Sequence, residues 1–440
     1  METSARAPDF AASAAAPSSV AFGRALLIFA AAFPLVCWPG LEHPFSQPKF
    51  LVLALAVPTV LLFSFSRLRI GWASMTQSVR IALLAWLFAT SASAAFGRFV
   101  SGEPLLLPLL GAGWLLLLMT FRPRTADLAW ALVAGGGVVS VLALLEFARF
   151  DPFAWFGWSP LLPANPRMRV YATLGNPDFV AAFLAGLLPV TFAIHQQSSR
   201  RWVPRILLAL QAAALCATGS RAVLVALLGL LFCTVLLRNK RTALFLGMAI
   251  LAAAVVLAAL PGARPLATTI RGRLYIWQVA VPRALDHPIL GLGPGAFAAA
   301  YPAWEAARWS SGRATPQQNL FAASQQHAHN DFVEILLEGG ALGLAAWLAL
   351  VSAILFRPWR LARGKLSVPA ALTDGTLALA AAGGIIALLS ISFVDFPFHR
   401  PTEQFLFWSL AALAILGGSR SASSSGLIST HAASERKTIP

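Results

Sequence analysis

The sequence predicts an all-α, polytopic integral membrane protein with about 12 transmembrane helices and one large loop that carries short helices. Of the 440 residues, 58% are hydrophobic and only 11% are charged, a composition outside the range of soluble globular proteins. Apolar runs long enough to cross a bilayer recur from end to end. The runs lack the alternation of polar and apolar residues that a barrel strand needs, so helices are expected to satisfy the backbone in lipid.

The apolar runs place the predicted spans in chain order. The seventh and twelfth are short, and either is also compatible with a re-entrant segment. The twelve ranges are Ala25–Leu41, Phe50–Phe65, Ile81–Phe96, Leu105–Phe121, Leu128–Leu145, Phe179–Ile194, Ile206–Thr218, Ala222–Leu237, Ala243–Leu260, Leu336–Phe356, Ala371–Phe393 and Phe405–Leu416.

Basic residues indicate how these spans are oriented. Most Lys and Arg fall in the loops on the side of the N-terminus, which the positive-inside rule assigns to the cytoplasm. An even number of spans then makes both termini cytoplasmic. Residues 1–24 form the N-terminal tail, residues 25–416 the transmembrane domain, and residues 417–440 a Ser-rich tail that we expect to be disordered. The net charge of +16 does not predict nucleic-acid binding, because the basic residues lie between apolar runs.

This orientation places the most polar parts of the chain on the outer face. They are the segments 146–178, 219–221, about 261–330 and 395–401. The third is by far the largest. Any chemistry that the protein performs is therefore expected outside.

A group of polar residues beside the tenth span is the best candidate for that chemistry. His327, His329 and Asn330 close the longest polar interval, and Asp331 and Glu334 follow at once. Polar groups at a membrane boundary are costly and tend to mark function. A histidine can take a proton from a hydroxyl near neutral pH without a large pKa shift. Two simpler interpretations stay open: a zinc site, although a third ligand at suitable spacing is missing, and capping of the next helix by Asn330.

Three arginines on the same face suggest that an anion binds there. Arg221 follows a Gly-Ser break in a long apolar stretch, and its side chain either reaches lipid headgroups or points into a cavity for an anionic substrate. Arg273 and Trp277 share one face of a predicted amphipathic helix that begins near Arg271. That helix is either an interfacial anchor or a grip on the phosphates of a lipid-linked substrate, which guanidinium groups suit.

These pieces together resemble the O-antigen ligase/polymerase superfamily. His329-Asn330, nine further residues and then Gly340-Ala341-Leu342-Gly343 match the signature of that family, at the end of the largest outer loop. The resemblance covers residues 170 to 416, and the first five spans agree in topology only. Asp178 departs from it, since many relatives carry Asn there. Three other stretches agree with it: Leu174–Asp178, Ser220-Arg221, and Arg273–Trp277 followed by Pro288–Gly293.

The resemblance implies glycosyl transfer at the periplasmic face of the bacterial inner membrane. The implied donor is a polysaccharide on undecaprenyl diphosphate, and the implied acceptor is a hydroxyl on lipid A core, another glycan or a protein. His329 is then expected to accept the hydroxyl proton, while Arg221 and Arg273 meet the charge of the leaving diphosphate. The other expected substrate-binding residues are Arg271, His327, Asn330, Asn176, Trp277, Gly340 and Gly343.

Neither a metal nor a cofactor is expected, since an acidic pair typical of a Mg²⁺ site is missing from the sequence and the family needs no metal. Inversion at the anomeric carbon would follow from a single displacement. If His329 is not the base, Glu334, Glu338 and Asp395 are next in line.

The sequence leaves the acceptor open. Ligation to lipid A core is favoured over polymerisation of O-antigen or exopolysaccharide and over protein O-glycosylation. A small-anion transporter is a remote alternative, because polar residues gather in one outer loop rather than in broken helices of two matching halves.

Overall fold

The computed structural model consists of helices and connecting turns over the residues that it describes, which are 17–156, 170–198, 201–237, 240–259, 266–313, 315, 318, 325–364 and 373–434. The α-helices are α1 (Pro17–Ala32), α2 (Gln47–Phe63), α3 (Leu68–Ser74), α4 (Gln77–Phe96), α5 (Gly102–Phe121), α6 (Thr125–Phe147), α7 (Pro177–Gln197), α8 (Trp202–Ala217), α9 (Ala222–Leu236), α10 (Lys240–Ala259), α11 (Leu266–Ala280), α12 (Ala296–Ser310), α13 (Asp331–Ala362), α14 (Thr373–Ile391) and α15 (Pro401–Ser434). Short 3₁₀ helices are η1 (Phe33–Leu35), η2 (Phe65–Arg67), η3 (Pro152–Phe156), η5 (Val281–Leu285) and η7 (Pro397–His399). No strand occurs within these ranges, which confirms the all-α class.

A helix lies at each of the twelve predicted span positions, but the predicted number of membrane crossings is not confirmed. Among the described residues, six helices are long and apolar enough to cross a membrane, or seven if α2 and its bent continuation through α3 form one span. The six are α4, α5, α6, α7, α13 and most of α14. Helices α1, α8 and α9 are apolar but shorter. The Gly-Ser-Arg break after α8 explains why α8 and α9 are short, because it divides one apolar stretch into two helices.

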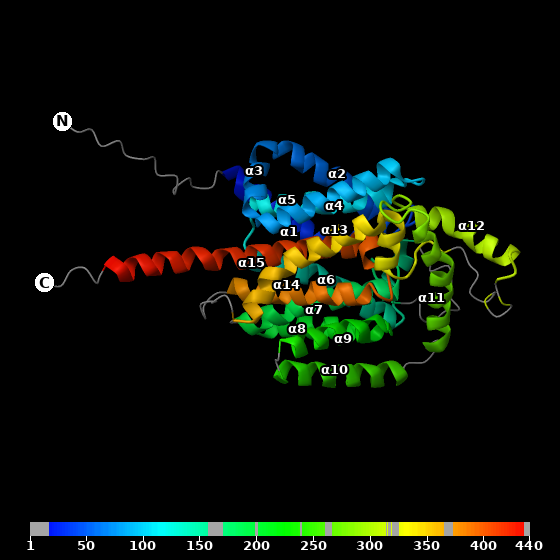
Figure 1. The fold of residues 1–440 in the computed structure, drawn as a ribbon. Coiled ribbons are helices and arrows are strands. Elements are labelled where there is room, and N and C mark those ends of the chain that lie inside the picture. Colours follow the sequence, from blue (N-terminus) through cyan, green and yellow to red (C-terminus); the bar gives the residue numbers. More distant parts are fainter. Residues whose placement is uncertain are drawn as a thin grey trace, which may run out of the picture.

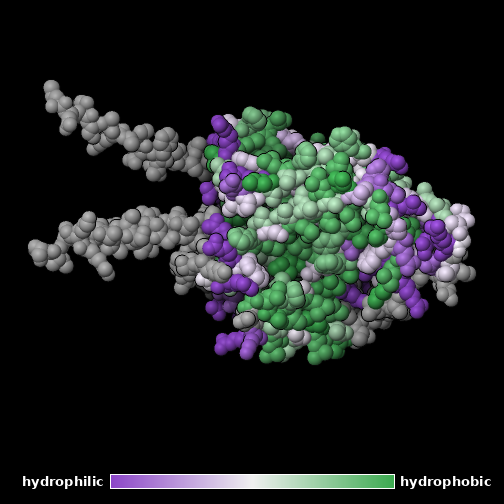
Figure 2. All heavy atoms as spheres, viewed as in Figure 1, coloured by the Kyte–Doolittle hydropathy of each residue, from purple (hydrophilic) through white to green (hydrophobic). Residues whose placement is uncertain are grey.

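The surface of the molecule has the pattern expected of a membrane protein. Figure 2 shows a broad apolar belt around the middle of the helical body, with polar residues gathered at its two ends. Large apolar side chains that the fold leaves exposed have lipid as their natural solvent. Among the described residues, Leu55, Leu62, Phe63, Phe88 and Leu251 are examples.

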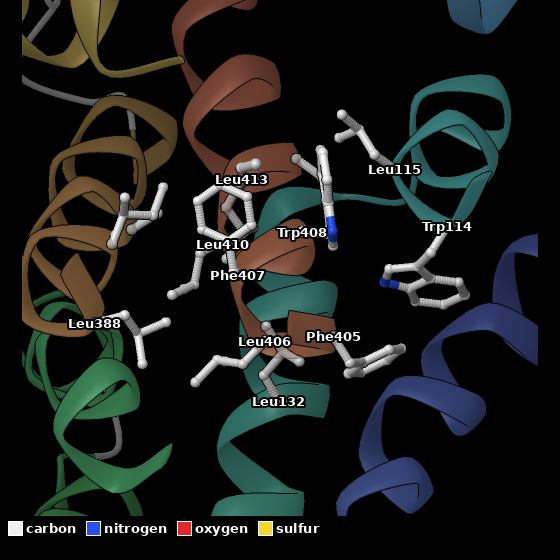
Figure 3. Packing of buried hydrophobic residues seen from close by; sticks show 14 of the residues in the cluster. Trp114, Leu115, Leu132, Leu388, Phe405, Leu406, Phe407, Trp408, Leu410 and Leu413 are labelled. Atoms are coloured by element: carbon white, nitrogen blue, oxygen red, sulfur yellow. The ribbon is translucent and has the colours of Figure 1, made fainter. Parts of the chain in front are cut away.

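Helix α15, which covers the predicted twelfth span, is the central column of the bundle. All residues from Pro401 to Gly417 are buried, and α15 packs against α5, α6, α7, α13 and α14. The indole of Trp114 donates a 2.9 Å hydrogen bond to Ser409 Oγ inside this core. Figure 3 shows the packing of Phe405, Leu406, Phe407, Trp408, Leu410 and Leu413 of α15 against Trp114 and Leu115, Leu132 and Leu388.

Helix α15 also continues where the sequence predicts a disordered tail. Its backbone is helical to Ser434, well past Gly417, and it projects from the body on the side where α1 begins (Figure 1). Extension of an existing helix needs no new nucleation, so a Ser- and Ala-rich continuation can remain helical. The residues beyond Ser434, and those of the N-terminal tail before Pro17, lie outside the described ranges.

The described residues of the large loop predicted at 261–330 form a cap on one end of the bundle. Helix α11 runs across the bundle end, and α12 extends outward beside it (Figure 1). The predicted amphipathic helix containing Arg271, Arg273 and Trp277 is α11. The cap has a small apolar core of its own, formed by Tyr275, Ile276, Val279, Ala280, Phe297, Tyr301, Ala328 and Leu337.

Two buried charged residues hold the turn that leads into α7. Lys49 Nζ donates to the carbonyl oxygens of Val36, Phe45 and Thr173 at 2.6, 2.9 and 2.6 Å. Glu146 Oε2 accepts from the amides of Tyr171 and Ala172 at 2.7 and 2.8 Å. Because an unpaired charge is costly to bury, these contacts fix the turn just before Asn176.

Candidate active site at the break in helix α13

Gly291 and Gly340, one from each of the two outer motifs, meet at one crossing. Gly340 has φ 64° and ψ −169°, so α13 is a short helix before this residue and a long one after it. The segment Pro288–Pro294 passes through the break. Four backbone hydrogen bonds join the two crossing segments: Leu292 N to Leu337 O (2.8 Å), Gly293 N to Glu338 O (3.0 Å), Ala341 N to Pro288 O (2.8 Å) and Leu342 N to Ile289 O (3.1 Å).

The close approach explains why glycines stand at these positions. A Cβ on Gly340 would lie 2.3 Å from the carbonyl oxygen of Ile289, and a Cβ on Gly291 would lie 2.3 Å from that of Glu338. Both residues also have positive φ, which glycine alone adopts without strain. The crossing supports the first turn of α13, and this turn carries the polar residues of the candidate site.

The first polar group on this support is formed by Asp331, Glu334, His327 and His399, which we call the histidine–carboxylate network. His327 Nδ1 lies 2.8 Å from Glu334 Oε1, and Glu334 Oε2 accepts from the Ala328 amide at 2.9 Å. His399 Nδ1 lies 2.6 Å from Asp331 Oδ1, and its Nε2 lies 3.7 Å from Glu334 Oε1. The network therefore links α13 to the turn between α14 and α15.

The network is buried and its oxygens are hydrogen-bonded. Asp331 Oδ2 accepts from Ser392 Oγ at 2.7 Å and from the Phe398 amide at 3.1 Å. Burial by itself would lower the pKa of His399, but the carboxylates of Glu334, Asp331 and Glu338 outweigh it and raise the pKa to about 10. His399 is therefore positively charged at neutral pH and balances the acids around it.

The second polar group is formed by Arg400, Asp395, His329 and Arg273, which we call the arginine cluster. Arg400 Nη2 lies 3.2 Å from Asp395 Oδ2, and His329 Nδ1 lies 3.9 Å from Asp395 Oδ1. Burial alone would raise the pKa of Asp395, but the charge of Arg400 and the His329 imidazole lower it to about 2. Burial lowers the pKa of Arg273, an effect that Asp395 and Asp178 oppose.

The arginine cluster is held by charge and by aromatic rings rather than by aligned hydrogen bonds. Arg400 also lies 3.0 Å from Glu403, yet its nitrogens make no hydrogen bond of good geometry with the described residues. Its Cζ sits 3.9 Å from the ring centre of Phe179 and 5.1 Å from that of Phe396. Nδ1 of His329 is likewise without a hydrogen bond among these residues, and His329 has φ 52°, a left-handed conformation that is strained in a non-glycine residue.

One aromatic ring contacts both motif histidines. The ring of His327 stacks on Phe396 with centroids 4.0 Å apart and planes at 17°, whereas His329 meets the same ring edge-on at 5.3 Å and 70°. His327 lines a cavity of about 730 Å³ at this end of the bundle, and His329 is not among the residues that line it. The two histidines thus belong to different polar groups although they are two residues apart.

Several of the predicted substrate-binding residues have clear local partners. Asn330 caps α13, since its Oδ1 accepts from the Val333 amide at 3.1 Å, which confirms the predicted capping. Asn176 caps α7 by accepting from the Asp178 amide at 2.8 Å. The indole of Trp277 donates to Ala328 O at 2.9 Å and so ties α11 to the histidine segment. Gly343 lines the cavity.

The other two predicted arginines lie at the ends of their own elements. Arg221 immediately precedes α9 and is half-buried, as its Gly-Ser break predicts. Arg271 is on the exposed side of α11. Neither lines the cavity. Asp395 lies 3.9 Å from His329 and interacts electrostatically with Arg273, so the structure relates these two predicted residues to one carboxylate.

Sequence reasoning missed two components of the site. His399 and Arg400 lie on the short connection between the last two spans, and they complete the two polar groups described above. A signal was present, because Asp395 to Pro401 places three charged or titratable residues between apolar helices. The second omission is the cavity itself, whose walls include Glu103 of α5 and Ser93 of α4, from the half of the chain that carries no motif.

The comparison with known proteins agrees with the motifs. Residues 206–348 match a family model described as O-antigen ligase. The match spans about a third of the chain, from within α8 to within α13, and it includes Arg221, Arg273, His327 and His329. It confirms the resemblance that the sequence predicts. No curated protein sequence matches the chain.

Proposed function

We propose that this membrane protein, a chain with an O-antigen ligase domain at residues 206–348, transfers an undecaprenyl-diphosphate-linked polysaccharide to an acceptor hydroxyl at the periplasmic face of the inner membrane. The observation that carries this proposal is the arginine cluster, in which His329, the buried Arg400 and the half-buried Arg273 all interact with Asp395. Ligation to lipid A core is the favoured reaction. Polymerisation of the glycan and protein O-glycosylation use the same donor and are the alternatives.

The chemistry assigns a separate task to each residue. The acceptor oxygen forms a bond to the anomeric carbon, and the bond from that carbon to the diphosphate oxygen breaks with its electron pair going to the diphosphate. His329 takes the hydroxyl proton. Arg273 and Arg221 meet the negative charge that develops on the leaving group. A single displacement of this kind inverts the anomeric configuration, and the residues named need no metal to perform it.

The direct test is transfer by purified protein. Undecaprenyl-diphosphate-linked glycan is incubated with lipid A core, with free glycan or with peptide as acceptor, in EDTA, and products are resolved by gel. We expect a product with lipid A core; a product with glycan or peptide instead identifies the polymerase or protein-glycosylating alternative. Absence of any product together with no binding of the donor would exclude the proposed function.

A second test concerns orientation. In a background lacking Cys37, Cys216 and Cys233, single cysteines are introduced at the exposed positions Ser311, Lys240 and Ala362. Only Ser311→Cys is expected to react with a membrane-impermeant thiol reagent in intact spheroplasts, because the cap faces the periplasm in this proposal. Reaction at Lys240→Cys or Ala362→Cys would place the cap in the cytoplasm and remove the site from its donor.

A further inference from the structure

The cavity beside His327 differs in character from the arginine cluster. It has a volume of about 730 Å³ and opens between α4, α5, α12, α13 and the turn before α15. Its polar wall includes the carboxyl groups of Glu103, Glu334 and Glu338, and its apolar wall includes Trp86 and Trp347. Neither Arg221 nor Arg273 lines it. Arg400 and the cationic His399 do, but Arg400 already lies beside Asp395 and Glu403, and His399 lies beside Asp331 and Glu334.

His327 presents one ring nitrogen to this cavity. Its Nδ1 is 2.8 Å from Glu334 Oε1, and its side chain is 28% exposed. Among the described residues, its Nε2 has no hydrogen-bond partner. The carboxylate takes the hydrogen bond of Nδ1 and leaves Nε2 as the ring nitrogen that a ligand can reach. The group offered to the cavity is therefore an imidazole nitrogen that can pair with a hydroxyl.

The contacts behind His327 hold its imidazole ring in place. Glu334 is held by the Ala328 amide at 2.9 Å and faces the charged imidazole of His399 at 3.7 Å. His399 is in turn held by Asp331 at 2.6 Å. The ring of His327 is stacked flat against Phe396. With so many partners the imidazole has little freedom to rotate, and a ligand does not have to order it.

These features select the ligand by chemistry. The three carboxyl groups share the cavity wall with the cationic His399 and Arg400, which already lie beside Glu334, Asp395 and Glu403, so charge alone does not make the cavity a diphosphate site. Carboxyl oxygens accept hydrogen bonds, and an imidazole nitrogen can pair with a hydroxyl, so a ligand rich in hydroxyls fits. Aromatic walls beside such groups suit the apolar faces of sugar rings. A hydroxyl-rich carbohydrate fits these features better than the charged head of the donor does.

We propose that this cavity is the acceptor subsite, and that His327 Nε2 forms a hydrogen bond with a hydroxyl of the acceptor sugar. This assignment rests on the proposed function and deepens it, because it separates the acceptor from the donor. The acceptor binds on the His327 side of Phe396, and the diphosphate binds at the arginine cluster. Binding of the sugar involves no covalent change in the protein.

The test uses two variants of different kinds and one matched control. His327→Ala removes the ring nitrogen proposed to bind the sugar hydroxyl. Ala298→Trp fills the cavity without removing any polar group, since Ala298 of α12 is exposed and lines the cavity. Ala299→Trp is the control, because Ala299 is the adjacent exposed residue and does not line it. Each purified protein is assayed for the KM of lipid A core, or of the glycan or peptide if wild type uses that instead, and for binding of undecaprenyl diphosphate.

The expected result is a rise in acceptor KM of about tenfold for His327→Ala, the effect of one lost hydrogen bond, and a larger rise for Ala298→Trp. Binding of undecaprenyl diphosphate should stay within about twofold of wild type in both, and Ala299→Trp should change neither quantity. An unchanged acceptor KM in a folded Ala298→Trp protein would overturn the proposal. Loss of diphosphate binding in Ala298→Trp alone would also overturn it, by making the cavity the donor site. Failure of the proposed function itself looks different, since wild type would then neither bind the diphosphate nor form product.

Discussion

The histidine–carboxylate network and the arginine cluster are neighbours built from the same short segments, yet they satisfy their polar groups in opposite ways. In the network, Asp331 and Glu334 accept hydrogen bonds at both oxygens from backbone and side chains. In the arginine cluster, Arg400, Asp395 and His329 are close in space without aligned hydrogen bonds. A satisfied network is rigid, whereas donors without good partners retain binding energy for a ligand. We therefore expect the network to shape the site and the arginine cluster to bind charge.

Both groups depend on the turn between α14 and α15. This turn contributes His399 to the network, and Asp395 and Arg400 to the arginine cluster. Phe396, which lies between them in the chain, contacts His327, His329 and Arg400. The position of this turn is fixed by α15, because the turn leads into the buried residues Pro401 to Gly417 of that helix.

The largest effect is expected from a change that removes the support of both groups. Gly340→Ala places a Cβ against the carbonyl of Ile289 in a backbone conformation essentially reserved for glycine. We expect little folded protein, measured as the monodisperse fraction after extraction in detergent. Gly339→Ala is the matched control, because a Cβ on Gly339 meets nothing within 4 Å. Equal recovery of the two variants would mean that the crossing is not needed for the fold.

Substitution of His329 tests the arginine cluster alone. General-base catalysis contributes about 10²- to 10⁴-fold, so His329→Ala should lose turnover by that factor while expression and donor binding persist. His329→Gln should be equally inactive, because an amide cannot hold the proton. The rate of transfer in EDTA is the measurement. Normal turnover in His329→Ala would move the base to Glu334, Glu338 or Asp395.

The two arginines should show a smaller but still large loss. Arg273→Ala and Arg221→Ala each leave the diphosphate without a partner, which costs about 3 kcal/mol or more of transition-state stabilisation. Lysine at either position should restore activity in part if a point charge is enough, and poorly if two parallel hydrogen bonds are required. Full activity of Arg221→Ala would instead favour the interpretation that the Arg221 side chain contacts lipid headgroups.

The outcome for these residues shows what a sequence can and cannot reveal. The helices were predictable, because hydropathy marks each apolar run and a helix lies at each of them. The number of membrane-spanning helices was not predictable, since the length of a span depends on breaks and bends such as the 70° bend after α2. The capping role of Asn330 follows from its place before an apolar helix, and the structure confirms it.

The division of the site into two groups was beyond the sequence. His327 and His329 look equivalent along the chain, and only the positive φ of His329 and the ring of Phe396 direct them apart. His399 is 68 residues from its partner Asp331, and a contact of that separation depends on how α14 and α15 pack. Local patterns hold no information of this kind.

Substitution of His399 tests the histidine–carboxylate network, and the expected change is in the stability of the fold. His399→Gln leaves buried acids without their cation, and breaking a buried ion pair costs about 3–5 kcal/mol. Because the folded-state pKa of His399 is raised to about 10 from an ordinary 6.5, the stabilisation is complete below pH 6.5 and is lost progressively as the pH rises through about 10. The melting temperature of wild type should therefore exceed that of His399→Gln at pH 6 and approach it above pH 10.

Two comparisons sharpen this experiment. His287→Gln is the control, since His287 lies in the cap and belongs to neither group. Asp395 gives the opposite sign: its lowered pKa means that the contribution of the arginine cluster is present above about pH 4 and is lost as the pH falls through about 2. A gap between wild type and His399→Gln that stays constant from pH 6 to 11 would contradict a charged His399.

The smallest expected effect concerns Asn330, which stands between the two groups. Its Oδ1 caps α13 and its Nδ2 donates to Phe393 O at 3.2 Å, so Asn330→Ala should cost about 1 kcal/mol of stability, the usual value for a lost cap. Asn176→Ala removes a cap of the same kind from α7 and should cost a similar amount. If both residues are caps only, transfer activity should follow the folded fraction in each variant. A loss of transfer in Asn330→Ala far beyond its loss of folded protein, with Asn176→Ala unaffected, would instead mean that Asn330 contacts a sugar hydroxyl, because a cap acts on substrate only through the position of its helix.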